Sequence, residues 1–331
     1  MPPEILIVGQ GVAGTVLAWE LERAGLSFRI ADAGHAQAAS AVAAGIINPI
    51  TGQRIVKSWR LDTLRPLARE VYGSLEKELG ISLWREMRVR RFYLKEDERR
   101  ILAEKQARGD LGDYAGTTDG EGFWIEGAAY VDVPALIAAA RKRWLAAGLL
   151  QEERVDFSAA RQDYNLVIDC SGAIGGPFSF VGWQYSKGEC LTVKMEGLPP
   201  DTILNRGHWM LPIGAHFVKV GATHVPGRRD LALTAEARLA LQGCISQMSS
   251  LPFEVVRQEA GVRAYVPDKK PVVGRHPSDS GLGICGGLGA KGTLFAPAVA
   301  REWISHLTEG TAFDPELDVA RFWRAARLVT P

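Results

Sequence analysis

A glycine-rich turn between a short apolar run and a helical run constrains the fold of this chain more than any other feature. Residues 5–8 read I-L-I-V, and residues 9–14 then read G-Q-G-V-A-G. This is the G-x-G-x-x-G pattern that joins a buried strand to a helix. A second short strand, residues 28–31, ends at Asp32. The order predicts a dinucleotide-binding βαβ unit with a phosphate at the helix N-terminus.

The three glycines and the acid have separate physical roles in such a unit. Gly9 permits the tight turn, Gly11 lets the backbone approach a pyrophosphate, and Gly14 allows close packing of helix and strand. The unpaired N–H groups and partial positive charge at the helix start attract phosphate. Asp32 stands where its carboxylate can accept hydrogen bonds from a ribose diol. Because the unit begins at residue 5, we expect that no signal peptide precedes it.

Composition argues against several classes of protein. The 331 residues suffice for two domains, and 47% hydrophobic with 23% charged residues is typical of a soluble globular protein. A formal net charge of +1 gives no electrostatic footprint for nucleic acid or an anionic membrane. No apolar run approaches the roughly 18 residues of a membrane helix. The four cysteines have no metal-ligand spacing, so we predict buried reduced thiols at Cys170 and Cys285, no metal, and a cytoplasmic protein.

Periodic patterns along the chain predict one parallel and one antiparallel sheet. Residues 60–108 have helical spacing, interrupted by a strand-like run at 88–94. Asp132 is a candidate N-cap for a helix that continues to about residue 147. Apolar strands near 165–172 and 281–284 end on small residues, as parallel strands do at a ligand site. Residues 183–256 alternate strand-like runs with glycine and proline, which is typical of an antiparallel sheet.

Four segments together resemble the D-amino-acid-oxidase-like family of FAD-dependent enzymes, which includes glycine oxidase and sarcosine oxidase. They are residues 9–32, 39–49, 167–172, and 260–275 followed by 287–297. They span nearly the whole chain, and an NAD enzyme of this length needs neither the second nor the fourth. The resemblance implies noncovalent FAD, because sarcosine oxidase tethers its flavin through a cysteine that has no counterpart between Cys244 and Cys285.

The resemblance also implies a fold and a domain plan. The fold class is α/β, with a Rossmann-like FAD-binding domain (βαβ, parallel sheet) and an inserted substrate domain built on an antiparallel sheet. We expect residues 1–58, 128–178 and 257–331 to form the discontinuous FAD-binding domain. Residues 59–127 and 179–256 would form the substrate domain.

Carried over motif by motif, the resemblance implies a set of FAD-binding residues. These are Gly9, Gly11, Val12, Ala13, Gly14, Asp32, Ala33, Ser40, Ala44, Gly45, Ile47, Asn48, Val155, Cys170, Ser171, Gly172, Arg263, Gly287, Leu288, Gly289, Ala290, Lys291, Gly292 and Thr293. Val155 would meet the adenine through its backbone. The helix that starts near residues 292–293 would aim its positive N-terminus at the pyrimidine side of the flavin.

Three residues are candidates for the reaction itself. By resemblance, Arg263 is the arginine that grips a substrate carboxylate in a bidentate fork, with pairing to Asp268 or Glu259 as the structural alternative. Trp209 matches the position of a tyrosine that assists this carboxylate in glycine oxidase, or it is a core aromatic. Lys291 contacts flavin or assists oxygen, or it only meets solvent at a loop.

The activity implied is an oxidase that takes a hydride from the carbon next to an amine and leaves an imine, with dioxygen as acceptor. Ala290 replaces a further arginine of glycine oxidase, which argues against glycine as substrate. The loop 287–292 is similar to the oxidase half of a tRNA-modifying enzyme, and this hints at a secondary amine with a carboxylate. Three alternatives stay open: a flavin dehydrogenase, a tRNA-modifying oxidase and a non-catalytic FAD-binding subunit. The sequence also leaves the oligomeric state open.

Overall fold

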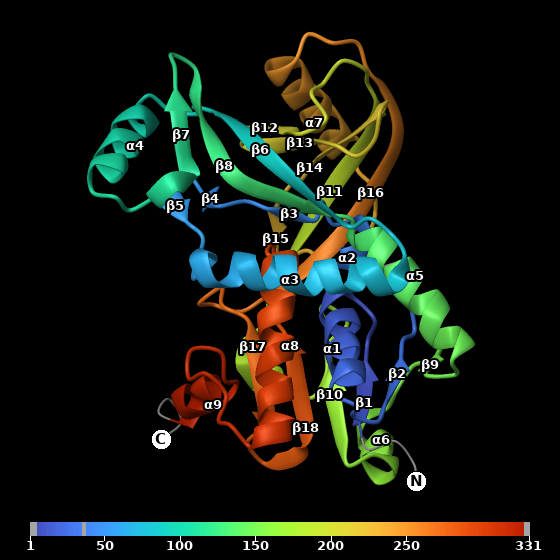
Figure 1. Ribbon diagram of the computed structural model, residues 1–331. Coiled ribbons are helices and arrows are strands. Elements are labelled where there is room, and N and C mark those ends of the chain that lie inside the picture. The colour runs from blue at the N-terminus through green and yellow to red at the C-terminus, as the bar shows by residue number, and fades with distance from the viewer. Residues whose placement is uncertain (1–4, 35–37, 328–331) are drawn as a thin grey trace.

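Two large β-sheets with helices packed around them form most of the described part of the chain (Figure 1). The computed structural model describes residues 5–34 and 38–327, with side chains through Trp323. The first sheet has the strand order β17-β18-β10-β1-β2-β9. Its strands are β1 (Ile5–Val8), β2 (Phe28–Ala31), β9 (Leu150–Gln151), β10 (Leu166–Asp169), β17 (Val272–His276) and β18 (Asp279–Gly286). All neighbours run parallel except β17, which is antiparallel to β18.

The predicted βαβ unit is confirmed. Helix α1 (Val12–Arg23) begins at Gly11 and connects β1 to β2, which pair in parallel. Its inner face is fully buried, including Leu17, Ala18 and Leu21. Beside it in Figure 1 lies α8 (Gly292–Glu309), and α3 (Leu61–Leu79) crosses between the two sheets and packs on α8. Helix α5 (Val133–Ala146) starts at Asp132, whose carboxylate accepts a hydrogen bond from the Ala135 N–H, as expected.

The second sheet has ten strands, in the order β15-β11-β14-β13-β12-β6-β8-β3, with β16 on β11 and β7 on β8. It is antiparallel apart from the β12–β6 pair. The strands are β3 (Ile46–Ile47), β6 (Trp84–Phe92), β7 (Ala115–Thr118), β8 (Gly122–Val131), β11 (Gln184–Lys194), β12 (Thr202–Arg206), β13 (His208–Pro212), β14 (Phe217–Gly221), β15 (Val225–Pro226) and β16 (Glu254–Tyr265). A separate hairpin pairs β4 (Ile50–Thr51) with β5 (Val56–Lys57).

The two faces of β11, β13 and β14 differ in character. One face packs on α7 (Ala235–Met248) through Leu191, Met210 and Val220, which belong to one buried cluster with Leu241 of the helix. Successive side chains of a strand alternate between faces, so Ser186, Gly188 and Cys190 of β11 lie on the opposite face. That opposite face carries the candidate substrate site.

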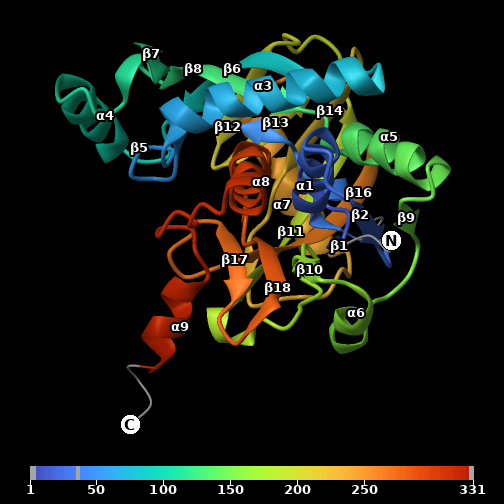
Figure 2. The ribbon, with the colours of Figure 1, turned by 60° about the horizontal axis from the view of Figure 1, so that its bottom comes forward.

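Shorter helices complete the described chain. They are α2 (Ala39–Val42), α4 (Asp97–Ala107), α6 (Phe157–Asp163) and α9 (Ala320–Arg327). Figure 2 shows α9 projecting beside β17. None of the helices in the described part of the chain is long and apolar enough to cross a membrane.

The fold class predicted from the sequence is confirmed, with one local adjustment. The strand expected at 88–94 is β6, at 84–92, and it separates two helices, α3 and α4. The chain passes between the sheets at several points: β3 pairs with β8, and β16 pairs with β11 before β17 and β18 return to the parallel sheet. The exact domain boundaries stay predictions.

Candidate cofactor and substrate site

The G-x-G-x-x-G turn has the geometry of a phosphate-binding loop. Gly9 has φ +103°, and a Cβ there would lie 2.7 Å from the Cys170 carbonyl oxygen. A Cβ on Gly14 would lie 2.0 Å from the Gly9 carbonyl oxygen, so both positions exclude a side chain. Gly11 is the N-cap of α1 and offers no side-chain cap. The N–H of Val12 donates to Ser40 Oγ over 3.0 Å. The other first-turn N–H groups have no acceptor within the helix, which suits a phosphate.

Asp32 sits in a buried polar network at the end of β2. Its Oδ1 accepts the Gln10 N–H over 2.9 Å, and its Oδ2 accepts from Arg141 Nη1 over 2.9 Å. The same Arg141 nitrogen donates to Gln10 Oε1 over 2.8 Å, and the far side of the guanidinium bonds to Glu152. The carboxylate predicted for the ribose is therefore held in place by a cation from α5. Arg141 lies 109 residues from Asp32 in sequence, and only the expectation that a buried acid needs a cation could have pointed to it.

The segment predicted to line the flavin packs closely against β8 around Gly45. This glycine has φ +69°, and a Cβ there would lie 1.9 Å from the Val131 carbonyl oxygen. The next residues pair with β8, with Ile47 opposite Ala129. Of the other predicted residues here, Ala44 packs against the buried cluster of β6 and β8, whereas Ala33 is exposed just after Asp32.

Lys291 is drawn into the protein instead of facing solvent. Its Nζ donates to Ser58 Oγ over 3.0 Å, and Ser58 in turn donates to the Asn48 carbonyl over 2.9 Å. Burial lowers the pKa of Lys291. Among the described residues no carboxylate pairs with it. The lysine therefore brings a positive charge to the segment predicted to line the flavin ring.

The start of α8 lies against the start of α1. A Cβ on Gly292 would be 3.1 Å from Val12 Cγ1. The loop before it is fixed to β16, because the Gly289 N–H donates to the Ala264 carbonyl and Leu288 bridges to Tyr265. Gly287 is buried in this loop, Ala290 is exposed, and the Thr293 carbonyl accepts a hydrogen bond from Tyr72. The loops predicted for the phosphates and for the flavin ring are thus neighbours.

The end of β10 forms the third predicted edge. Cys170 and Cys285 are buried free thiols that follow paired residues of β10 and β18, which confirms the cysteine prediction. Burial raises the pKa of Cys170. The N–H and hydroxyl of Ser171 donate to the Asp169 carboxylate over 2.9 and 2.6 Å, and this fixes the turn that continues to Gly172.

Arg263 is a partly buried cation without a carboxylate partner in the described chain. Its Nη2 donates to the Thr223 carbonyl over 3.2 Å, and its burial lowers the pKa of the guanidinium. Asp268 pairs with Arg321, and Glu259 pairs with Arg257 and Lys219. The structural alternative raised by the sequence is therefore wrong for both acids.

A glycine provides the space that the Arg263 guanidinium occupies. A Cβ on Gly188 would lie 2.1 Å from Arg263 Nη2 and 2.9 Å from the Thr223 carbonyl oxygen. Trp209 lies farther along the same face, with its ring over Gly221, where a Cβ would be 2.8 Å from Trp209 Cζ2. The ring is half-buried and packs against the neighbouring apolar cluster, so the core-aromatic interpretation also holds.

His224 is a polar neighbour of Arg263 that sequence reasoning did not select. Its Nδ1 lies 2.7 Å from Ser186 Oγ, and Ser186 stands directly opposite Arg263 in the β11–β16 pair. Partial burial, Arg263 and Lys269 all lower the pKa of His224. The strand register brings these groups together, and no spacing in the sequence signals it.

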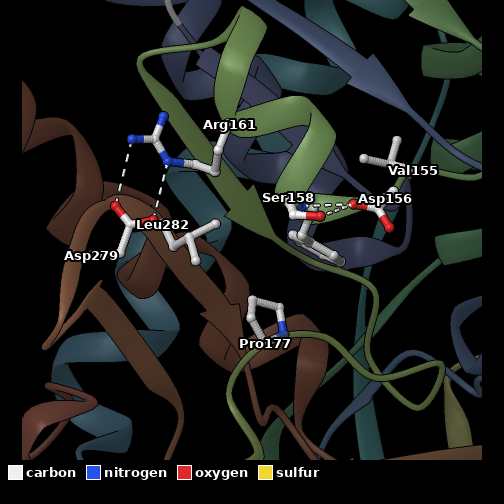
Figure 3. Close-up of a pocket in the computed structure, with 8 residues that line it drawn as sticks. Val155, Asp156, Ser158, Arg161, Pro177, Asp279 and Leu282 are labelled. Carbon is white, nitrogen blue, oxygen red and sulfur yellow. Dashed lines mark hydrogen bonds and ion pairs between the residues drawn. The ribbon is translucent and has the colours of Figure 1, made fainter.

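A cavity of about 610 Å³ lies elsewhere, on the α6 side of the parallel sheet (Figure 3). The Arg161–Asp279 pair forms one edge, and Asp156 caps α6 through the Ser158 N–H. Val155 is the one predicted cofactor residue that lines it. Arg263 and Lys291 are not part of it, so this cavity is separate from the residues expected to act on substrate.

The comparisons with known proteins find oxidoreductases. The family model described as FAD dependent oxidoreductase matches residues 4–306. Glycine oxidase of Bacillus subtilis (strain 168) is 36% identical over 121 residues, which cover 34% of this chain and 31% of that enzyme. Glycine oxidase from Geobacillus kaustophilus superposes with a TM-score of 0.78 at 23% identity, covering 96% of this chain and 98% of the other. Iminodiacetate oxidase from Chelativorans sp. BNC1 gives 0.73 at 21% identity, covering 94% and 97%. L-proline dehydrogenase from P. horikoshii gives 0.77 at 16%, covering 98% of both chains.

Proposed function

Because the chain belongs to the family of FAD-dependent oxidoreductases, we propose that it oxidises the C–N bond of a small amine or amino acid that carries a carboxylate. FAD, when bound, supplies the acceptor for the hydride that leaves the carbon next to the amine. Glycine oxidase and iminodiacetate oxidase, which both have this fold, act on substrates of that kind by their names. The task left to this chain's own residues is to hold the cofactor and to orient the substrate.

The surroundings of Arg263 are the observation that supports a carboxylated substrate. A guanidinium has five N–H donors, and Arg263 uses one of them in its bond to Thr223. Desolvating a cation is costly without an anion, and a carboxylate fits the free edge of the guanidinium in a bidentate pair. Removing one partner of such a buried pair costs roughly 2–5 kcal/mol. This environment supports the proposal of an anionic substrate group at this point.

The described residues suit FAD, and they support a proposed place for each of its parts. The phosphates would lie at the start of α1, and the adenosine ribose at Asp32, which Arg141 holds in place. Lys291 and the start of α8 would supply positive charge beside the flavin ring. The cofactor is proposed to be noncovalent, and dioxygen is proposed as the acceptor.

The proposal is tested by anaerobic bleaching of the flavin absorbance. The panel contains D-amino acids, glycine, sarcosine and other N-substituted glycines. Each compound is compared with the corresponding amine that lacks the carboxylate. We expect bleaching by a carboxylated amine, and reoxidation in air with release of peroxide. Slow reoxidation in air would indicate a dehydrogenase with another electron acceptor. A flavin that no member of the panel reduces would contradict the proposal.

The role of Arg263 is tested by Arg263→Ala, with Arg257→Ala as the matched control on the same strand. Arg257 pairs with Glu259 on the surface, so its loss should leave the kinetics unchanged. Arg263→Ala should raise KM for the carboxylated amine by a factor that corresponds to roughly 2–5 kcal/mol. Equal kinetics for the two variants would make Arg263 a structural residue.

A further inference from the structure

Three side chains from separate segments meet on the face of the ten-stranded sheet opposite α7. Ser186 of β11 and Arg263 of β16 are direct register partners, and such partners have Cβ atoms about 4.5–5.5 Å apart. Arg263 donates to the carbonyl of Thr223, the residue immediately before His224. The His224 ring lies against Ser186 Oγ at 2.7 Å. The imidazole is thereby fixed beside the guanidinium proposed to hold the substrate carboxylate.

The contact with Ser186 engages one ring nitrogen of His224 and leaves the other open. Nδ1 lies 2.7 Å from Ser186 Oγ, and a serine hydroxyl can accept a hydrogen bond from Nδ1–H. Within the described part of the chain Nε2 has no hydrogen-bond partner. In the neutral tautomer that has its proton on Nδ1, Nε2 carries no proton. A bare imidazole nitrogen is a proton acceptor.

The charged groups around His224 are both cations. Arg263, on β16, and Lys269, in the loop that follows β16, both act on it electrostatically. Ser186, on β11, is neutral, and no carboxylate of the described residues acts on the ring. Partial burial and these two cations hold the pKa of His224 below its usual 6.5. The ring is consequently neutral and able to accept a proton near pH 7.

We propose that His224 is a catalytic residue that removes a proton from the ammonium group of the bound substrate. The inference rests on the proposed function, because an amine must be neutral before a hydride can leave its α-carbon. The amine nitrogen and the carboxylate share that carbon, so a carboxylate on Arg263 places the ammonium beside the imidazole. The N–H bond breaks, its electron pair stays on the amine nitrogen, and the proton bonds to Nε2. The ring is exposed at the edge of the site and passes the proton on to water.

The test compares His224→Gln with the wild-type holoenzyme in anaerobic flavin reduction by the amine that the panel identifies. Wild-type reduction should rise with pH through an apparent pKa below 6.5, since the acceptor must be unprotonated. The variant should lose about 10²-fold in rate at pH 7, as expected for loss of a general base. It should also lose the titration below pH 6.5 and speed up only as the free amine accumulates at high pH. Binding of a non-oxidisable carboxylate should be unchanged.

A series of N-substituted glycines with falling amine pKa separates proton removal from a structural role. The loss caused by His224→Gln should shrink as the amine becomes less basic. His216→Gln is the matched control, because His216 is exposed at the far end of β14 beside Glu196. A loss equal for all amines, or an unchanged pH profile, would overturn the inference.

Ser186→Ala provides a second variant that keeps the imidazole itself. It removes the acceptor for Nδ1–H and should shift the apparent pKa of reduction while retaining part of the rate. An unshifted profile in Ser186→Ala would also overturn the inference. If no carboxylated amine reduces the wild-type flavin at any pH, then the proposed function itself fails. If the wild type is reduced normally and His224→Gln has the same rate and pH profile, then only the inference about His224 fails.

Discussion

Gly188→Ala is the substitution that tests the proposed substrate site most directly. The new Cβ would lie 2.1 Å from Arg263 Nη2 and 2.9 Å from the Thr223 carbonyl oxygen. The guanidinium is the far end of a flexible side chain and would move, whereas the carbonyl belongs to the backbone and would shift by only a few tenths of an ångström. Arg263 would then lose both its hydrogen bond to Thr223 and its position for the substrate carboxylate.

The expected magnitudes separate binding from stability. Gly188 has no positive φ, so alanine causes no backbone strain there. Alanine also lowers the conformational entropy of the unfolded chain, which stabilises the native state by about 0.4–1 kcal/mol. The contact with the Thr223 backbone carbonyl outweighs this gain, and the free energy of unfolding should fall by about 1–3 kcal/mol. The affinity for the carboxylated amine should fall by roughly 2–5 kcal/mol, or about 30-fold to several-thousand-fold.

The assay is a titration of flavin absorbance with the substrate or its non-oxidisable carboxylate, beside urea unfolding of the same samples. Gly261→Ala is the matched control: it is the register partner of Gly188, and its Cβ would meet only an ordinary contact at 3.4 Å. In an Arg263→Lys background, which lacks Nη2, Gly188→Ala should cost little further affinity. Wild-type affinity in Gly188→Ala alone would refute the reasoning.

Three further predictions concern the cofactor side and the parallel sheet. Gly11→Val should abolish flavin retention, because the added side chain starts 3.2 Å from Ser40 Oγ at the helix N-terminus meant for phosphate; a yellow purified variant would contradict this. Arg141→Met should weaken FAD binding by about 1–3 kcal/mol, because Asp32 loses a buried cation; fluorescence titration of the apoprotein measures it, and an unchanged Kd would exclude a role for Arg141 at the ribose. Burial raises the pKa of Asp169, so the native state binds the proton more tightly than the unfolded chain. The free energy of unfolding should therefore fall as pH rises from about 3.8 through the native pKa, and Asp169→Asn should flatten this part of the urea-derived profile; equal slopes would refute the assignment.

The cofactor-binding half of the site could be predicted from the sequence because its determinants are local. Gly9 must adopt a positive φ and Gly14 must leave room for the Gly9 carbonyl, and both demands fall within one short turn. Helix α5 begins at Asp132 for a similarly local reason, since the cap and the capped N–H are three residues apart. Arg263 was identified by resemblance to a family motif, and the structure adds that no acid in the described chain neutralises it.

The substrate side was less predictable because strand register decides it. Gly188 and Ser186 carry no local signal, and they become important only because β16 pairs with β11 in a register that places Arg263 beside them. The same register sets His224 against Ser186, from a segment that follows β14. A shift by a single residue would turn these side chains toward α7, so burial of the cluster around Leu191 fixes the polar face as well.

The sequence alone determined the βαβ unit, the kind of cofactor and the two types of sheet, because turn glycines, caps and apolar periodicity act over a few residues. Only the tertiary structure decided which charges are paired. In the folded chain Arg141 pairs with Asp32 and Arg321 pairs with Asp268, whereas Arg263 has no acidic partner among the described residues. The physical reason is that the free energy of a buried charge depends on the groups packed around it, and long-range packing brings those groups together.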